Sequence, residues 1–104
     1  MAGIFPLQGD FAAVVAGPRE RYTFRRGALE MLLDPPEGLR KTKVPLQRTP
    51  EVEGGAITIS KTGRTLMVET WEPRKLFVCK ADDVRLLLKG KLNAVNLTDV
   101  TEPE

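Results

Sequence analysis

The chain has 104 residues, a length typical of one domain, with 41% apolar and 29% charged residues and a formal net charge of only +2. This balance excludes a disordered chain and does not by itself demand a polyanionic partner. Histidine is absent and cysteine occurs once, which excludes internal disulfides and cysteine-rich zinc sites.

The N-terminal region shows no targeting or membrane signal. The longest apolar run, 11–16, is far shorter than the roughly 20 residues that span a membrane. A secretory signal would need a longer apolar stretch, and Asp10 interrupts it. We therefore expect a cytoplasmic protein with no membrane partner. Many prolines beside few asparagines and glutamines resemble thermophilic usage.

The first third of the chain predicts short strands. We expect strands at 11–16 and 21–24, and Gly17 with Pro18 ends the first of them. Residues 28–33 fit either a third strand or a turn of helix, because Ala, Leu, Glu and Met are good helix formers. Residues 34–55 are a Pro/Gly-rich basic loop or arm. A structureless loop of this length is unusual, so either 43–47 forms a short edge strand there or the segment is a functional arm.

A β-hairpin over 56–70 is the clearest element. Ile57 and Ile59 alternate with polar residues, and Leu66 and Val68 repeat the pattern after a turn at 61–64. A loop of even length pairs Ile59 with Leu66 and puts all four apolar side chains on one face. The β-branched Thr62 disfavours positive φ, which favours a four-residue loop with Gly63 in the left-handed conformation.

Three elements follow the hairpin. Residues 71–74 predict a second turn and 75–79 an interior strand with two apolar faces. A helix is predicted at 83–89, with Asp82 as its N-cap, Asp83 in its first turn and Gly90 closing it.

The C-terminus predicts a weak strand at 92–97 and an acidic, frayed tail at 98–104. No internal repeat with a period of 20–50 residues is visible. The expected fold is therefore a single β-rich domain over 1–97. It is mostly β, a small antiparallel barrel or bent sheet of about six strands with one short helix.

No catalytic constellation is visible. Residues 55–62 come close to a phosphate-binding loop, but Ser60 stands where that loop needs glycine, and the segment prefers a strand. Without histidine, the side chain best suited to proton transfer near neutral pH is missing. Cys79 lies among apolar residues, so its thiol should be inert. We predict no catalytic residue, no metal and no cofactor.

Two basic stretches and one aromatic residue are the candidates for contacts. As a strand, 19–26 would place Tyr22 and Phe24 on one face, either to stack bases or to enter the core. Residues 40–48 carry four positive charges and no acid, which suits a phosphate-contacting arm or a solvated loop. Trp71 could anchor an interface or cap the barrel core. The candidate contact residues are Arg21, Arg25, Arg26, Arg40, Lys41, Lys43, Arg48 and Trp71.

These patterns favour a non-catalytic interaction module that forms a homo-oligomer or is a subunit of a larger assembly, with protein as its partner. The alternative is a nucleic-acid-binding small β-barrel that uses 19–26 and 40–48. No small-molecule substrate is indicated.

Overall fold

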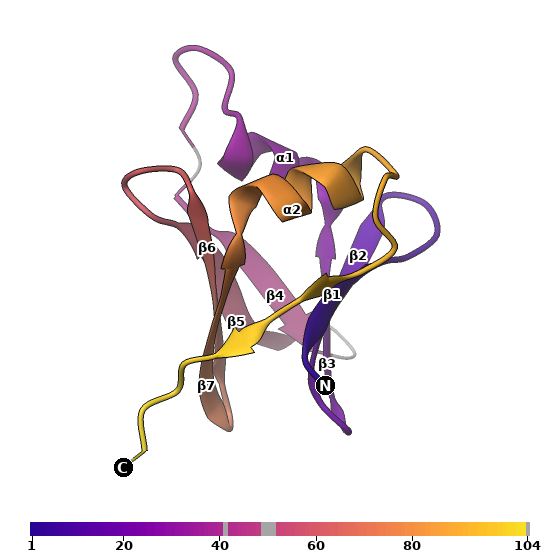
Figure 1. The fold of residues 1–104 in the computed structure, drawn as a ribbon, viewed down its shortest axis with the longest axis vertical. Coiled ribbons are helices and arrows are strands. Elements are labelled where there is room, and N and C mark those ends of the chain that lie inside the picture. The colour runs from indigo at the N-terminus through magenta and orange to yellow at the C-terminus, as the bar shows by residue number, and fades with distance from the viewer. Residues whose placement is uncertain (41, 49–51, 104) are drawn as a thin grey trace.

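One antiparallel sheet curls into a nearly closed barrel, and two short helices cover one end of it (Figure 1). The computed structural model describes residues 1–40, 42–48 and 52–103. In this part of the chain there are nine strands, where the sequence predicts about six. The elements are β1 (Gly3–Pro6), β2 (Phe11–Gly17), β3 (Glu20–Arg25), α1 (Arg26–Leu33), β4 (Val44–Arg48), β5 (Val52–Ile59), β6 (Thr65–Trp71), β7 (Arg74–Lys80), α2 (Ala81–Leu88), β8 (Val95–Asn96) and β9 (Thr98–Asp99). The predicted class, a mostly β barrel-like sheet, is confirmed.

The C-terminal stretch closes the barrel. The strand order is β8-β1-β2-β3-β4-β5-β6-β7-β9, and only Leu97 separates β8 from β9. Val95–Asn96 pairs with β1, whereas Thr98–Asp99 pairs with β7. One short stretch therefore joins both edges of the sheet. The tail expected to be frayed at 98–104 is held at its start, since Val100 N donates to the Leu76 carbonyl at 2.8 Å.

The barrel consists of two halves with the same plan, β1-β2-β3-α1-β4 and β5-β6-β7-α2-β8/β9. Their registers also correspond. Ile4 pairs with Val14 in one half, as Ile57 pairs with Val68 in the other. The last strand of each half pairs with the first strand of the other, through Val44↔Ile57 and Val95↔Ile4. The halves are thus related by an approximate twofold rotation. This correspondence between the halves is not predicted from the sequence.

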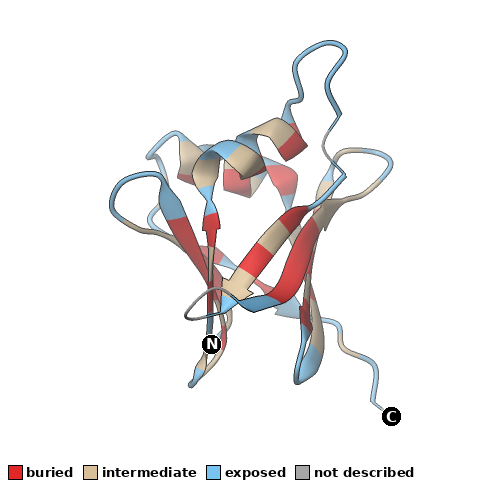
Figure 2. Ribbon diagram, turned by 180° about the vertical axis from the view of Figure 1, so that it is seen from behind, coloured by how far each residue is buried: buried red, intermediate tan, exposed pale blue. Residues whose placement is uncertain are grey.

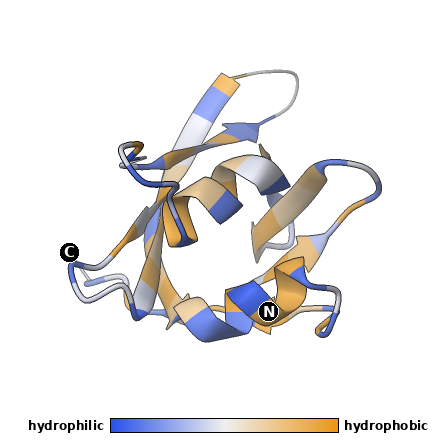
Figure 3. Cartoon of the chain, turned by 90° about the horizontal axis from the view of Figure 1, so that it is seen from above, coloured by the Kyte–Doolittle hydropathy of each residue, from blue (hydrophilic) through white to orange (hydrophobic). Residues whose placement is uncertain are grey.

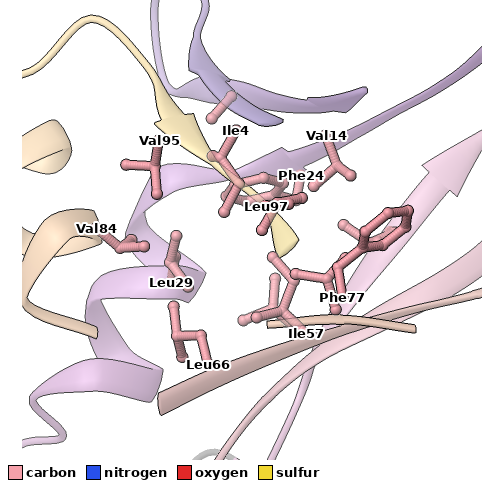
Figure 4. Close-up of a cluster of buried hydrophobic side chains, with 14 of the residues drawn as sticks. Ile4, Val14, Phe24, Leu29, Ile57, Leu66, Phe77, Val84, Val95 and Leu97 are labelled. Carbon is pink, nitrogen blue, oxygen red and sulfur yellow. The ribbon is translucent and has the colours of Figure 1, made fainter. Parts of the chain in front are cut away.

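The core fills the barrel and the space under the helices. In β3, β4 and β6 buried residues alternate with less buried ones, as a sheet with one apolar face requires, whereas β2 and β5 contain continuous buried runs (Figure 2). Figure 4 shows Ile4 and Val14 from the first half with Ile57 and Phe77 from the second, and Leu29 and Val84 from the helices. Each fully buried side chain of this size contributes about 1.5–3 kcal/mol.

Helix α1 decides the ambiguity at 28–33 in favour of a helix, so the strand interpretation is wrong. Leu29, Leu32 and Leu33 have helical spacing and are buried against the barrel. The helix begins at Arg26, whose N–H donates to the Asp10 carbonyl at 2.7 Å.

Helix α2 begins at Ala81, two residues before the predicted start. Its N-cap is Lys80, which makes no side-chain cap, so the capping role predicted for Asp82 is wrong. Asp82 and Asp83 lie in the first turn, where negative charge is favourable. Gly90 has φ +77° and closes the helix as predicted.

The hairpin prediction is confirmed in register and in loop. Ile59 pairs with Leu66 and Ile57 with Val68. Ser60 N donates to the Thr65 carbonyl at 2.9 Å across a four-residue loop, with φ +75° at Gly63.

The Pro/Gly-rich segment 34–55 contains strand β4 and the start of β5. Its strand β4 is not an edge strand, because it pairs with β5 and, through the single bridge Thr23↔Gln47, with β3. Strand β5 starts at Val52. Of the described residues, those before Val44 form a connection that extends past the helices (Figure 1). The strand predicted at 92–97 is limited to Val95–Asn96.

Candidate nucleic-acid interface

The aromatic residues of the basic strand β3 belong to the core. Tyr22 and Phe24 are 1% and 2% exposed, so neither can stack a base. Arg21 and Arg25 alternate with them and lie on the outside. Arg26 does not continue this face, because it begins α1 and its Nη2 donates to the Leu7 carbonyl at 3.3 Å. Of the two interpretations of 19–26, the structure bears out the one that buries the aromatics.

Two of the predicted arginines, Arg21 and Arg48, meet at a hollow of about 380 Å³. A third arginine, Arg19, joins them there and was not among the predicted contacts. We call this site the arginine hollow; its lining is Arg19, Glu20, Arg21, Tyr22, Arg48 and Glu72. The β2–β3 and β6–β7 turns, which contribute Arg19 and Glu72, lie at the end of the barrel opposite the helices (Figure 1).

The backbone of β5 positions Arg48. A Cβ on Gly54 would approach Arg48 Cγ at 2.7 Å and Tyr22 Cε2 at 2.9 Å. The aliphatic stem of Arg48 therefore lies across the bare backbone of Gly54. Its Nη1 donates to the Glu72 carbonyl at 3.3 Å, which directs the guanidinium toward the hollow.

Lys75 neutralises the charge of Glu20, one of the two acidic residues in the lining of the arginine hollow. Lys75 Nζ lies 3.0 Å from each carboxylate oxygen of Glu20, and it also donates to the Ala16 carbonyl at 3.3 Å. Glu20 and Lys75 occupy corresponding positions in β3 and β7, so this ion pair bridges the two halves. With Glu20 neutralised, three guanidinium groups face the single acid Glu72, and the lining is positive.

Trp71 lies outside the core and directly precedes Glu72 of the hollow lining in the sequence. In β6 the buried residues alternate with outward ones, and Trp71 follows the buried Thr70. Its side chain is 43% exposed, and Nε1 donates to Glu69 Oε1 at 3.2 Å. Trp71 therefore does not cap the barrel. It offers an exposed aromatic surface next to Glu72, on the hairpin that borders the arginine hollow.

The remaining predicted contacts do not join this site. The Arg25 guanidinium lies over the Phe11 ring, 4.9 Å from its centroid. Arg25 and Arg26 line a different hollow that also includes Asp10. Arg40 and Lys43 are exposed on the connection between α1 and β4, and Lys41 lies outside the described residues. The predicted contact residues are therefore divided among separate parts of the surface.

Burial keeps the thiol of Cys79 protonated. Desolvation, with a smaller effect from the charge of Asp83, raises the pKa of Cys79 to about 12. Within residues 1–40, 42–48 and 52–103, no three His, Cys, Asp or Glu side chains gather where they could hold a metal ion. Neither described helix has the length and apolar character needed to cross a membrane. Comparison with protein-family models, curated proteins and solved structures found no match to this chain.

Proposed function

We propose that the protein is a non-catalytic binding module that holds the sugar-phosphate backbone of a nucleic acid in the arginine hollow. The observation that carries the proposal is the convergence of Arg19, Arg21 and Arg48 from a turn and two strands. A guanidinium presents a rigid fork of N–H donors that matches the oxygens of a phosphate and keeps its charge at every physiological pH.

The absence of catalysis is part of the proposal and has its own support. The sequence contains no histidine, so a proton-transfer group that titrates near neutrality is missing. The one thiol has its pKa raised far above the physiological range. A charged, open hollow beside an exposed aromatic side chain suits binding better than chemistry.

Trp71 favours a single-stranded ligand. An indole accepts the face of an unstacked base, and such stacking contributes about 1–3 kcal/mol per base. A duplex keeps its bases stacked on each other and would use the arginines alone. With three phosphates neutralised, the slope of log affinity against log salt should be about −2 for a single strand.

Fluorescence anisotropy with labelled single-stranded and duplex oligonucleotides tests the proposal. Arg21→Gln with Arg48→Gln should weaken binding of every sequence at least tenfold and flatten the salt slope. Trp71→Ala should weaken single-strand binding more than duplex binding. Arg25→Gln is the control, because it removes a positive charge from the same outward side of β3, with Thr23 between it and Arg21, and should change binding little.

Two results would overturn the proposal. One is no change in anisotropy with either oligonucleotide at low salt. The other is an equal loss for Arg25→Gln and for the double variant, which would show that general charge and not the arginine hollow attracts the ligand.

A further inference from the structure

The two helices form a paired layer whose outer side carries complementary charges. They cross the helix-covered end of the barrel side by side (Figure 3). Between them runs a groove of about 300 Å³ with Leu33 and Leu88 in its lining. The α1 side of the groove carries Glu30 and Asp34, which are acidic. The α2 side carries Arg85 and Lys89, which are basic.

One acid–base pair of this pattern, Asp34 with Arg85, is already formed within the chain. Arg85 Nε lies 3.1 Å from Asp34 Oδ2, and Arg85 Nη2 donates to the Leu33 carbonyl at 3.2 Å. Under the approximate twofold rotation, Glu30 corresponds to Arg85 and Lys89 to Asp34. Glu30 and Lys89 thus face each other at the other end of the groove, and no ion pair within the described residues uses either side chain.

The outer side of the helix layer is also partly apolar. Leu86 of α2 is 38% exposed, and Met31 occupies the corresponding position of α1 and is half-buried. Exposed leucine beside a charged rim is the composition of a small interface between proteins. A partner for this surface must place basic side chains over α1 and acidic side chains over α2.

We infer that a second copy of this chain is that partner, docked helix layer against helix layer in a symmetric dimer. A twofold axis along the groove places α1 of one copy over α2 of the other. Glu30 then lies over the partner's Lys89, and Lys89 over the partner's Glu30, so each pairing occurs twice. The inference concerns a different surface from the arginine hollow and does not depend on nucleic-acid binding.

The connection between α1 and β4 fits this arrangement. It extends beyond the helix layer (Figure 1) and carries Leu39, which is 58% exposed. Gly38, with φ +83°, and a 3.0 Å hydrogen bond from Leu39 N to the Pro36 carbonyl shape the turn before it. In the dimer, the two connections flank the interface from opposite sides, and each can cover the partner's helices.

Sedimentation equilibrium of the full chain tests the dimer by charge exchange. Glu30→Lys alone and Lys89→Glu alone each place like charges together twice and should raise the dimer Kd at least about tenfold. The double variant restores opposite charges and should recover the parent Kd to within about threefold. Arg74→Glu, at the opposite end of the barrel, is the charge-matched control for Lys89→Glu and should leave the dimer intact.

Circular dichroism on each variant separates loss of dimer from loss of fold. A parent chain that stays monomeric at millimolar concentration would overturn the inference. So would a double variant that is folded but remains as monomeric as the single variants. A dimer that the single variants leave unchanged would place the interface elsewhere and would equally refute it.

Discussion

Replacing Gly55 with alanine should be among the most damaging single changes in this barrel. Gly55 lies in β5 between two partners, opposite Leu46 of β4 and Thr70 of β6. A Cβ at this position would collide with the carbonyl oxygen of Glu69, and it would lie 3.2 Å from Leu46 Cδ1. A backbone carbonyl cannot rotate away as a flexible side chain can, so β5 and β6 must separate locally.

The size of the effect follows from these contacts. Overpacking of a rigid site costs about 1–3 kcal/mol, and each ladder hydrogen bond lost as the strands separate costs about 1 kcal/mol more. We expect Gly55→Ala to lower the free energy of unfolding by about 2–4 kcal/mol. That is a large share of the roughly 5–15 kcal/mol available to a domain, and it should lower Tm by about 10–20 °C.

Gly27→Ala is the control for this prediction. Gly27 lies in the first turn of α1, and a Cβ there would meet nothing within 4 Å. Since alanine is the better helix former, we expect a gain of about 0.5–1 kcal/mol. Urea unfolding followed by far-ultraviolet circular dichroism measures both variants. The reasoning is refuted if Gly55→Ala unfolds within about 0.5 kcal/mol of the parent, or if the two substitutions destabilise equally.

The raised pKa of Cys79, about 12 against an ordinary 9.0, leaves about a thousandfold less thiolate at mildly alkaline pH. A disulfide reagent should therefore label folded protein far more slowly than urea-unfolded protein, and equal rates would contradict this. Hydrogen bonds from the Thr101 hydroxyl and N–H lower the pKa of Asp99 below its ordinary 3.8. The pKa of Asp99 is lower in the folded chain than in the unfolded chain. The stabilisation is therefore complete at neutral pH, and it is lost only as the pH falls through the pKa of the folded chain. Hydrogen exchange should show the Val100 amide protected at neutral pH but exposed in Asp99→Ala; protection unchanged by the substitution would refute the role of Asp99.

The sequence predicts correctly those elements whose conformation is determined by residues close together in the chain. The β5–β6 hairpin is one, because alternating apolar residues and a glycine at the required turn position agree on one register. The helix starts are different. Ala81 N donates to the Arg64 carbonyl at 2.9 Å, and Arg26 N makes the corresponding bond to Asp10. Such tertiary bonds begin each helix earlier than any capping pattern indicates, and they cannot be seen in sequence.

The duplication was hidden because the spacing between corresponding residues is not constant. It is 53 residues for Ile4 and Ile57, 55 for Tyr22 and Phe77, and 51 for Val44 and Val95. A search for one fixed period does not find this pattern, because the β5–β6 and β6–β7 hairpins are each one residue longer than their counterparts and the connection after α1 is longer than the one after α2.

The arginine hollow was visible only in part. The composition of the chain marked Arg21 and Arg48 as candidates, but their meeting depends on the placement of β3 and β4 and on the space above Gly54. Arg19 was missed although it follows Pro18 as Arg74 follows Pro73 in the other half. Of the two roles considered for Tyr22 and Phe24, entry into the core is confirmed and base stacking is wrong, because burying their large apolar rings inside the barrel is more favourable than exposing them on its surface.

The exchange of final strands between the halves has an evolutionary consequence. Neither half contains a complete set of neighbours for its own strands, since β4 completes β5 and the C-terminal stretch completes β1. A chain of half this length, carrying one repeat, would reach the same closed architecture by joining an identical molecule. Fusing two such genes in tandem would make that association permanent and let each copy acquire its own surface. The arginines of the first repeat and the exposed tryptophan of the second are the kind of divergence that such a fusion permits.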